Sequence, residues 1–125
     1  MEAKGIELEA AADDVLVVAV EGEHDIYTAP VLRQRLDEAL ATGGGIVVDL
    51  TGATFVDSSV LGALLDARRR ALDAGHGYVV CVGETVEPGV QRILDITGLV
   101  PVLPVLRTRD EAVAAARAAN GAAPT

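Results

Sequence analysis

The sequence predicts an α/β fold in which helices pack on a mixed, mostly parallel sheet. Near the N-terminus apolar residues alternate with polar ones, which is typical of a half-buried strand. Further along, short runs rich in Val and Ile alternate with longer segments of helical periodicity. Strands separated by helices pair in parallel, because each crossover brings the chain back to the same end of the sheet. The expected order of elements is therefore ββαβαβαβα.

The first half of the chain predicts a hairpin, a helix and a central strand. Two acidic residues at 13–14 form the turn of the hairpin. The helix has a hydroxyl residue at its N-cap and repeats apolar residues on one face. The expected elements are strands over 6–10 and 15–20, an irregular stretch over 21–27, a helix from N-cap Thr28 to Gly43 with Leu32, Leu36, Ala39 and Leu40 inward, and a buried strand over 46–50.

The second half predicts three further helices separated by two strands. The segment over 51–57 links the central strand to the first of these helices and is not assigned to an element. Three arginines at 68–70 lie in the C-terminal half of that helix, where cations suit the helix dipole. The expected elements are a helix over 58–73 with Leu61, Leu64, Leu65, Ala71 and Leu72 inward, a strand over 78–82, a helix from Pro88 to a cap at Gly98, a strand over 102–106, and a helix begun by a capping box at Thr108 and Glu111 and ended near Asn120.

Length and charge bound the architecture and exclude several functions. The chain has 125 residues, below the roughly 150 typical of one domain, so one domain is expected over 1–120 with a frayed tail over 121–125. Half of the residues are apolar, which is enough to build a core. Nineteen acidic residues against ten basic ones give a net charge of −9, the wrong sign for binding nucleic acid or an anionic membrane.

Cysteine usage and the N-terminus indicate a soluble protein of a reducing compartment. The single cysteine, Cys81, allows neither an internal disulfide nor a multi-thiolate metal site, and two histidines are too few for a zinc motif, so no cofactor is expected. The first residues lack the pattern of a signal peptide, and no apolar run reaches the roughly 18 residues of a membrane span. We therefore expect a cytoplasmic protein without a membrane segment.

The most informative stretch runs from Thr51 to Gly62, where two serines stand at the start of a predicted helix. A helix N-terminus carries about half a positive charge and unpaired amides, so a phosphate on Ser58 would meet a favourable field. The plain alternative is that Ser58 is an N-cap and Asp57 a turn former. Spacing alone favours the plain alternative.

Three motifs stand out in this chain. The first is Asp49-Leu50-Thr51-Gly52 through Phe55-Val56-Asp57-Ser58-Ser59; the second is Gly22-Glu23-His24-Asp25 with Thr28 and Ala29; the third is Leu94-Asp95-Ile96-Thr97-Gly98-Leu99. They resemble the motifs of the STAS family, specifically the anti-sigma factor antagonists (anti-anti-sigma factors). The motifs occur in the family's order on a matching series of elements, and the resemblance covers nearly the whole chain.

The resemblance implies a STAS fold and a regulatory role for this chain. Such a protein binds an anti-sigma factor with serine kinase activity, frees the sigma factor, and is switched off when its serine is phosphorylated until a phosphoserine phosphatase resets it. The matching serine here is Ser58, with Ser59 as the alternative. The partner-binding residues that the resemblance implies are Glu23, Asp25, Thr28, Asp57, Ser58, Ser59, Leu61 and Gly62. Asp25 is expected to lie close to Ser58.

One residue departs from the family pattern: Val60 stands where many relatives have glycine, and its bulk is expected to narrow access to Ser58.

A STAS module that acts as a scaffold without phosphorylation, in a stress-signalling or transporter-associated complex, is the alternative function. An enzyme is not expected. Ser58 with His24 and Asp25 lacks the Gly-x-Ser-x-Gly turn of a nucleophile, and the glycines at 43–45 lack the Gly-Lys-Ser/Thr of a phosphate loop. The arginines at 68–70 are either a docking patch or a solvated helix face.

Overall fold

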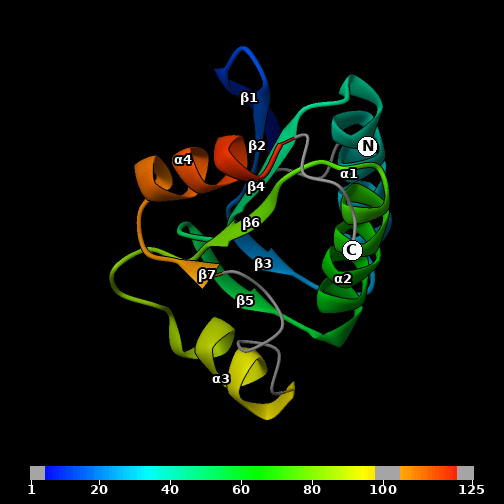
Figure 1. Cartoon of the computed structure of the whole chain (residues 1–125). Coiled ribbons are helices and arrows are strands. Elements are labelled where there is room, and N and C mark those ends of the chain that lie inside the picture. Colours follow the sequence, from blue (N-terminus) through cyan, green and yellow to red (C-terminus); the bar gives the residue numbers. More distant parts are fainter. Residues whose placement is uncertain (1–4, 98–104, 121–125) are drawn as a thin grey trace.

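The computed structural model describes residues 5–97 and 105–120. Its elements in chain order are β1 (Ile6–Ala12), β2 (Val15–Val20), β3 (Gly22–His24), α1 (Ala29–Thr42), β4 (Gly45–Asp49), β5 (Ala53–Val56), α2 (Ser58–Asp73), β6 (Tyr78–Cys81), α3 (Pro88–Thr97), β7 (Val105–Leu106) and α4 (Arg109–Ala119). Five strands form the main sheet in the order β1-β2-β4-β6-β7, and β3 pairs with β5 in a second, smaller sheet (Figure 1). None of the helices in the described ranges is long and apolar enough to cross a membrane.

The main sheet confirms the predicted α/β class. The hairpin of β1 and β2 is antiparallel, and every later pairing in this sheet is parallel. Helices α1 and α2 cover one face, while α4 covers the other (Figure 1). The central strand β4 is buried along its whole length, because its side chains point alternately into the two layers: Ile46 and Val48 toward α1 and α2, Val47 toward α4.

Two short strands were not predicted from the sequence, in which 21–27 is expected to be irregular and 51–57 is not assigned to an element. Strands β3 and β5 are three and four residues long and pair in parallel, with Glu23 opposite Phe55 and His24 opposite Val56. Alternation over so few residues gives no readable period, so only the pairing of distant segments reveals them. Helix α3 packs against β5, where Phe55 forms a bridge with Gly89. This small sheet brings the second family motif beside the first.

The ends of the helices follow the sequence in one case and depart from it in another. The capping box at the start of α4 is present: the Thr108 hydroxyl accepts from the Glu111 amide, and the Glu111 carboxylate accepts from the Thr108 amide. Thr28 does precede α1, but its side chain makes no capping hydrogen bond to the helix. The predicted cap at Gly98, most of the strand over 102–106 and the tail over 121–125 lie outside the described residues.

One residue of α2 predicted to face inward is on the surface. The buried face of this helix is centred on Leu64, Ala67 and Ala71, while the Leu72 side chain is 39% exposed. Each helical residue turns the chain by about 100°, so Leu72 falls beside the stripe that Ala71 occupies. The apolar periodicity of the sequence locates the helix correctly, but it does not determine which residues at the edge of the apolar face are buried against the sheet.

Candidate functional site

Asp57, not Ser58, is the N-cap of α2. Its backbone is extended, and its Oδ1 accepts hydrogen bonds from the amides of Ser59 at 2.9 Å and Val60 at 3.2 Å. Ser58 is therefore the first residue inside the helix, and its side chain is exposed. The carboxylate already occupies the amides of Ser59 and Val60 in the first helical turn, which differs from the expectation that a phosphate would find them free.

The second oxygen of the same carboxylate reaches another part of the chain. Asp57 Oδ2 accepts a hydrogen bond from the amide of Ile26 at 3.1 Å, across 31 residues of sequence. The segment that follows β3 is thereby joined to the start of α2. The structure thus brings the segment that contains Asp25 beside Asp57, the residue that precedes Ser58.

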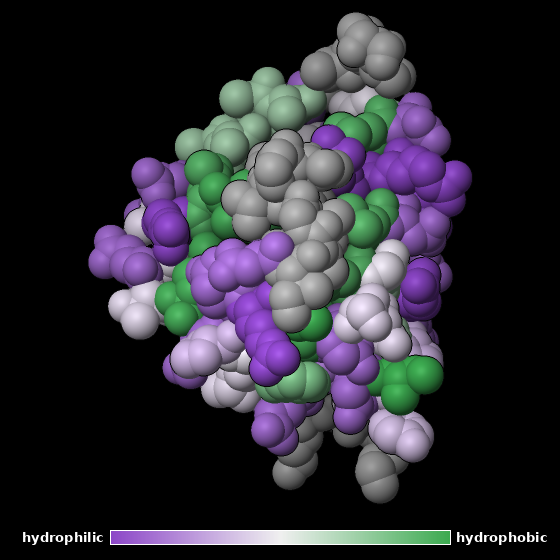
Figure 2. All heavy atoms as spheres, turned by 90° about the horizontal axis from the view of Figure 1, so that it is seen from below, coloured by the Kyte–Doolittle hydropathy of each residue, from purple (hydrophilic) through white to green (hydrophobic). Residues whose placement is uncertain are grey.

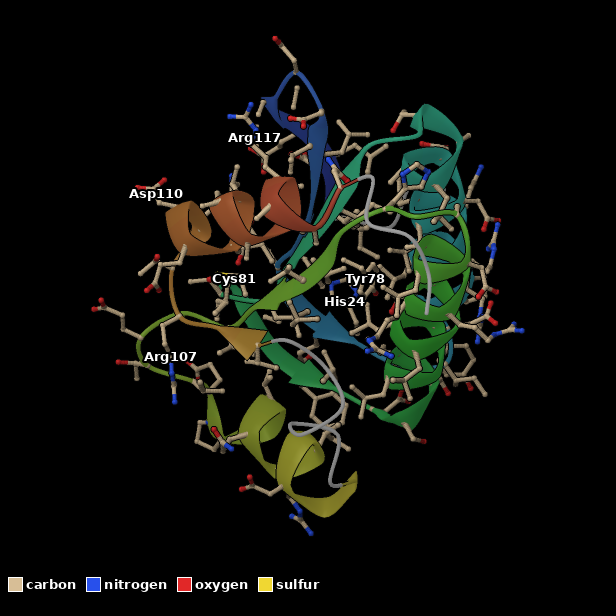
Figure 3. All side chains as sticks on the ribbon, in the orientation of Figure 1. His24, Tyr78, Cys81, Arg107, Asp110 and Arg117 are labelled. Carbon is tan, nitrogen blue, oxygen red and sulfur yellow. The ribbon has the colours of Figure 1, made fainter. Side chains whose placement is uncertain are left out.

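The segment from His24 to Thr28 is held in shape by its own hydrogen bonds. The buried His24 ring, in the interior beside β3 (Figure 3), donates from Nε2 to the Glu21 carbonyl at 2.7 Å and places Nδ1 3.1 Å from the Thr28 hydroxyl. The amide of Asp25 donates to that hydroxyl at 3.0 Å, and the Asp25 carboxylate accepts from the Tyr27 amide at 2.9 Å. Both ring nitrogens of His24 are thus engaged within its own segment, so the ring supports this segment instead of activating Ser58.

Two exposed apolar side chains lie within this segment and a third lies on β5, the strand paired with β3; these three side chains, here called the apolar face, were not predicted from the sequence. The apolar face consists of Ile26, Tyr27 and Phe55, whose side chains are 63%, 86% and 42% exposed. Glu23 lies opposite Phe55 in the small sheet and is exposed, and the half-buried Asp25 and Asp57 add negative charge. Figure 2 shows the molecule from below, where hydrophobic surface is exposed between strongly hydrophilic residues. The signal in the sequence that could have revealed this face is the pair Ile26 and Tyr27, two large apolar residues in a stretch that lacks the periodicity of a buried helix or strand.

The other predicted site residues are placed as follows. Ser59 and Gly62 are half-buried on α2, and an added Cβ on Gly62 would lie 3.7 Å from Arg33 Nη2, an ordinary contact. Leu61 packs in the core with a side chain only 2% exposed. Val60 is also buried and turns its side chain inward, two residues around the helix from the exposed Ser58. The bulk of Val60 therefore does not cover the Ser58 hydroxyl in this structure.

The first family motif begins with a carboxylate on the opposite layer of the molecule. Asp49, at the end of β4, is buried, and it accepts from the Thr51 amide at 2.9 Å and from Arg109 Nε at 3.0 Å. Burial of the Asp49 carboxyl acts to raise its pKa, but hydrogen bonds from Thr51 and Arg109 and the charge of Arg109 outweigh burial and hold the pKa below its ordinary value. These bonds fix the turn that leads into β5 and so place the start of α2.

Two of the three arginines at 68–70 form ion pairs on the exposed face of the helices, and Arg68 is half-buried. Arg69 pairs with Asp66 at 2.7 Å, and Arg70 pairs with Asp37 of α1 at 2.5 Å. Within the described ranges, no three His, Cys, Asp or Glu side chains are arranged to hold a metal ion.

Comparisons with known proteins agree with this architecture. Residues 8–112 match the STAS domain family. The anti-sigma F factor antagonist of Paenibacillus polymyxa is 36% identical over 93 residues, which are 73% of this chain and 77% of that protein.

Two solved structures show the same fold. The crystal structure of an anti-sigma factor antagonist from Mycobacterium paratuberculosis has a TM-score of 0.79 and 30% identity, covering 94% of this chain and 99% of the other. The Bacillus cell fate determinant SpoIIAA in its phosphorylated form has a TM-score of 0.66 and 21% identity over 88% of this chain and 97% of its own, a likeness of fold alone. From its matched residues, its relatives and its fold, this chain belongs to the STAS domain family.

Proposed function

We propose that this protein is an anti-sigma factor antagonist that works by partner switching. In its unmodified form it binds an anti-sigma factor with serine kinase activity, and the sigma factor held by that partner is released. Its curated relatives are named anti-sigma factor antagonists, and SpoIIAA, which shares this fold, has been solved in a phosphorylated form. Because a sigma factor acts where RNA polymerase works, this function belongs in the cytoplasm.

The observation that carries the proposal is the exposed Ser58 hydroxyl beside the acidic N-cap Asp57 and next to the apolar face. A surface that combines large apolar side chains with a rim of carboxylates suits a partner with an apolar patch bordered by basic residues. The binding surface we propose comprises Glu23, Asp25, Ile26, Tyr27, Phe55, Asp57, Ser58 and Ser59, with Thr28 and Leu61 supporting it from within and Gly62 extending it along α2.

Phosphorylation of Ser58 is the proposed off-switch. The partner kinase transfers the γ-phosphoryl group of ATP to Ser58 Oγ, forming an O–P bond as the bond to ADP breaks, and the hydroxyl proton passes to a base of the kinase. The phosphate adds about −1.5 to −2 charges. Two unit charges 4 Å apart repel by about 4 kcal/mol at an effective dielectric of 20, and about 1.4 kcal/mol already weakens binding tenfold. A phosphatase that hydrolyses the ester restores the binding form.

The test is intact-mass analysis after incubation with the cognate anti-sigma factor and ATP. The wild type and Ser59→Ala should each gain one phosphate, whereas Ser58→Ala should gain none and should still bind the anti-sigma factor. A phosphorylated Ser58→Ala protein would move the site to Ser59 or elsewhere. A wild type that binds its partner and gains no phosphate would identify the chain as a STAS scaffold.

A further inference from the structure

We infer that Asp57 is a positioning residue that holds the exposed Ile26–Tyr27 segment in its binding pose, and that a phosphate on Ser58 acts on this segment by displacing the Asp57 carboxylate. The inference rests on the proposed function only in the identity of the binding partner, which is the anti-sigma factor. The structural event is internal to the chain and is testable without it.

The two carboxylate oxygens of Asp57 accept hydrogen bonds from different parts of the chain. Oδ1 accepts from the amides of Ser59 and Val60, and Oδ2 accepts from the amide of Ile26. The two oxygens belong to one rigid planar group. Any rotation of the side chain that changes one set of hydrogen bonds therefore changes the other, so the cap of α2 and the pose of the segment after β3 are coupled.

The second step concerns the segment itself. His24, Asp25 and Thr28 hold it together through hydrogen bonds that do not involve α2. The segment therefore shifts as a unit, and the bond from Ile26 to Asp57 orients it against the helix. Ile26 and Tyr27 project their side chains from this unit with most of their surface exposed.

The third step is the effect of a phosphate on Ser58. The amides of Ser59 and Val60 are taken by Asp57 Oδ1, and the Leu61 amide donates to the Asp57 carbonyl at 3.2 Å. Phosphate oxygens are strong acceptors that favour a helix N-terminus, so the phosphate and the Asp57 carboxylate compete for the same donors. Repulsion between the two anions adds to this competition. The carboxylate turns away, and the Ile26 amide loses its acceptor.

The consequence is a second contribution to partner release beyond direct repulsion. A segment that has lost its anchor must be ordered again when the partner binds, and ordering side chains at an interface lowers affinity. Phosphorylation then weakens the partner's contact with Ile26 and Tyr27 as well as its contact with Ser58.

The decisive variant is Asp57→Asn, because the amide oxygen of Asn still caps α2 while its NH2 group cannot accept from Ile26. Asp57→Ser, which keeps one capping oxygen, is the second variant in case the first is unstable. Phosphoserine is incorporated at position 58 during translation, so no kinase is needed. The readouts are the 1H–15N chemical shift and hydrogen-exchange rate of the Ile26 amide, with the Tyr78 amide of the core as internal reference.

In the otherwise wild-type chain, phosphoserine at 58 should move the Ile26 signal toward its position in Asp57→Asn and accelerate its exchange about two- to tenfold, the loss of one hydrogen bond. In the Asp57→Asn background the same phosphate should leave Ile26 nearly unchanged. The inference is overturned if phosphoserine at 58 changes neither the chemical shift nor the exchange rate of the Ile26 amide, or if it changes them equally in the wild-type and Asp57→Asn backgrounds. Neither result depends on whether an anti-sigma factor binds, so failure of the proposed function would be seen separately in the mass and binding assays.

Discussion

Arg109, the first residue of α4, donates to the buried carboxylate of Asp49 at the end of β4, with Nε at 3.0 Å and Nη2 at 2.8 Å from Oδ2. The same guanidinium reaches Glu9 of β1 at 3.2 Å. One side chain thus joins the last described helix to the central strand and to the N-terminal hairpin, on the layer opposite α1 and α2.

The Asp49–Arg109 pair predicts a specific pH dependence of stability. Because the pKa of Asp49 is lowered in the folded protein from 3.8, its contribution is fully present above that pH and is lost as the pH falls through the lower, folded pKa. Asp49→Asn should lower the free energy of unfolding by about 1–3 kcal/mol at neutral pH. Urea unfolding of both proteins should show that their difference in free energy of unfolding shrinks below about pH 4. A difference that stays constant with pH would contradict a stabilising role of the ionised Asp49 carboxylate.

Gly77 and Gly62 form a matched pair for a test of close packing. A methyl group on Gly77 would overlap the carbonyl oxygen of Ala116 in α4, whereas one on Gly62 meets only Arg33 at 3.7 Å. Gly77→Ala should destabilise the fold by about 1–3 kcal/mol through overpacking. Gly62→Ala should stabilise it by about 0.5–1 kcal/mol, because alanine favours a helix. Urea midpoints of the two variants measure both effects, and equal midpoints would refute the close approach of α4.

Leu64 and Leu72 on α2 separate a core residue from a surface one. Leu64 is fully buried, and its truncation to alanine should cost about 2–5 kcal/mol by leaving a cavity. Leu72→Ala removes the same atoms from a partly exposed position and should cost about 1 kcal/mol or less. Thermal and urea unfolding of both variants check the orientation of the helix; a larger loss at Leu72 would mean that α2 is turned differently.

Tyr27 is expected to act in binding and not in stability. Its side chain is 86% exposed, so Tyr27→Ala should leave the free energy of unfolding within about 0.5 kcal/mol of wild type. Affinity for the anti-sigma factor should fall about tenfold or more, as is typical of an aromatic anchor. Titration calorimetry is the measurement. The control is Leu72→Ala, which removes an exposed apolar side chain at the other end of α2 and should bind as wild type does. Unchanged affinity of Tyr27→Ala would remove the apolar face from the interface.

Ser58→Asp and Ser58→Asn isolate the effect of charge, because the two side chains have nearly the same size. We expect Ser58→Asp to bind the anti-sigma factor roughly tenfold more weakly than Ser58→Asn, since the added carboxylate stands beside Asp57 at the acidic rim. The difference should shrink at high ionic strength, because salt screens exposed charges. Equal affinities at low salt would show that electrostatic repulsion does not drive release.

Much of the fold was predictable because the signals for it are local. The helical period at 32–40 and the β-branched run at 46–50 identify their elements without reference to the rest of the chain, and alternation with helices implies parallel pairing. The capping box at Thr108 was also readable, since both of its partners lie within four residues. The family motifs located the region of the candidate site but not its geometry.

What escaped prediction depends on contacts between residues far apart in the chain. Strands β3 and β5 exist as strands only because they pair with each other, and their few residues carry no period. The capping role of Asp57 depends on which residue takes extended backbone at the helix start, and its bond to Ile26 spans 31 residues. Periodicity and the capping box at Thr108 predicted the kinds and order of the elements other than β3 and β5. The folding of the elements onto one another placed an exposed serine, a bridging carboxylate and an apolar face together, because hydrogen bonds and packing act through space and not along the chain.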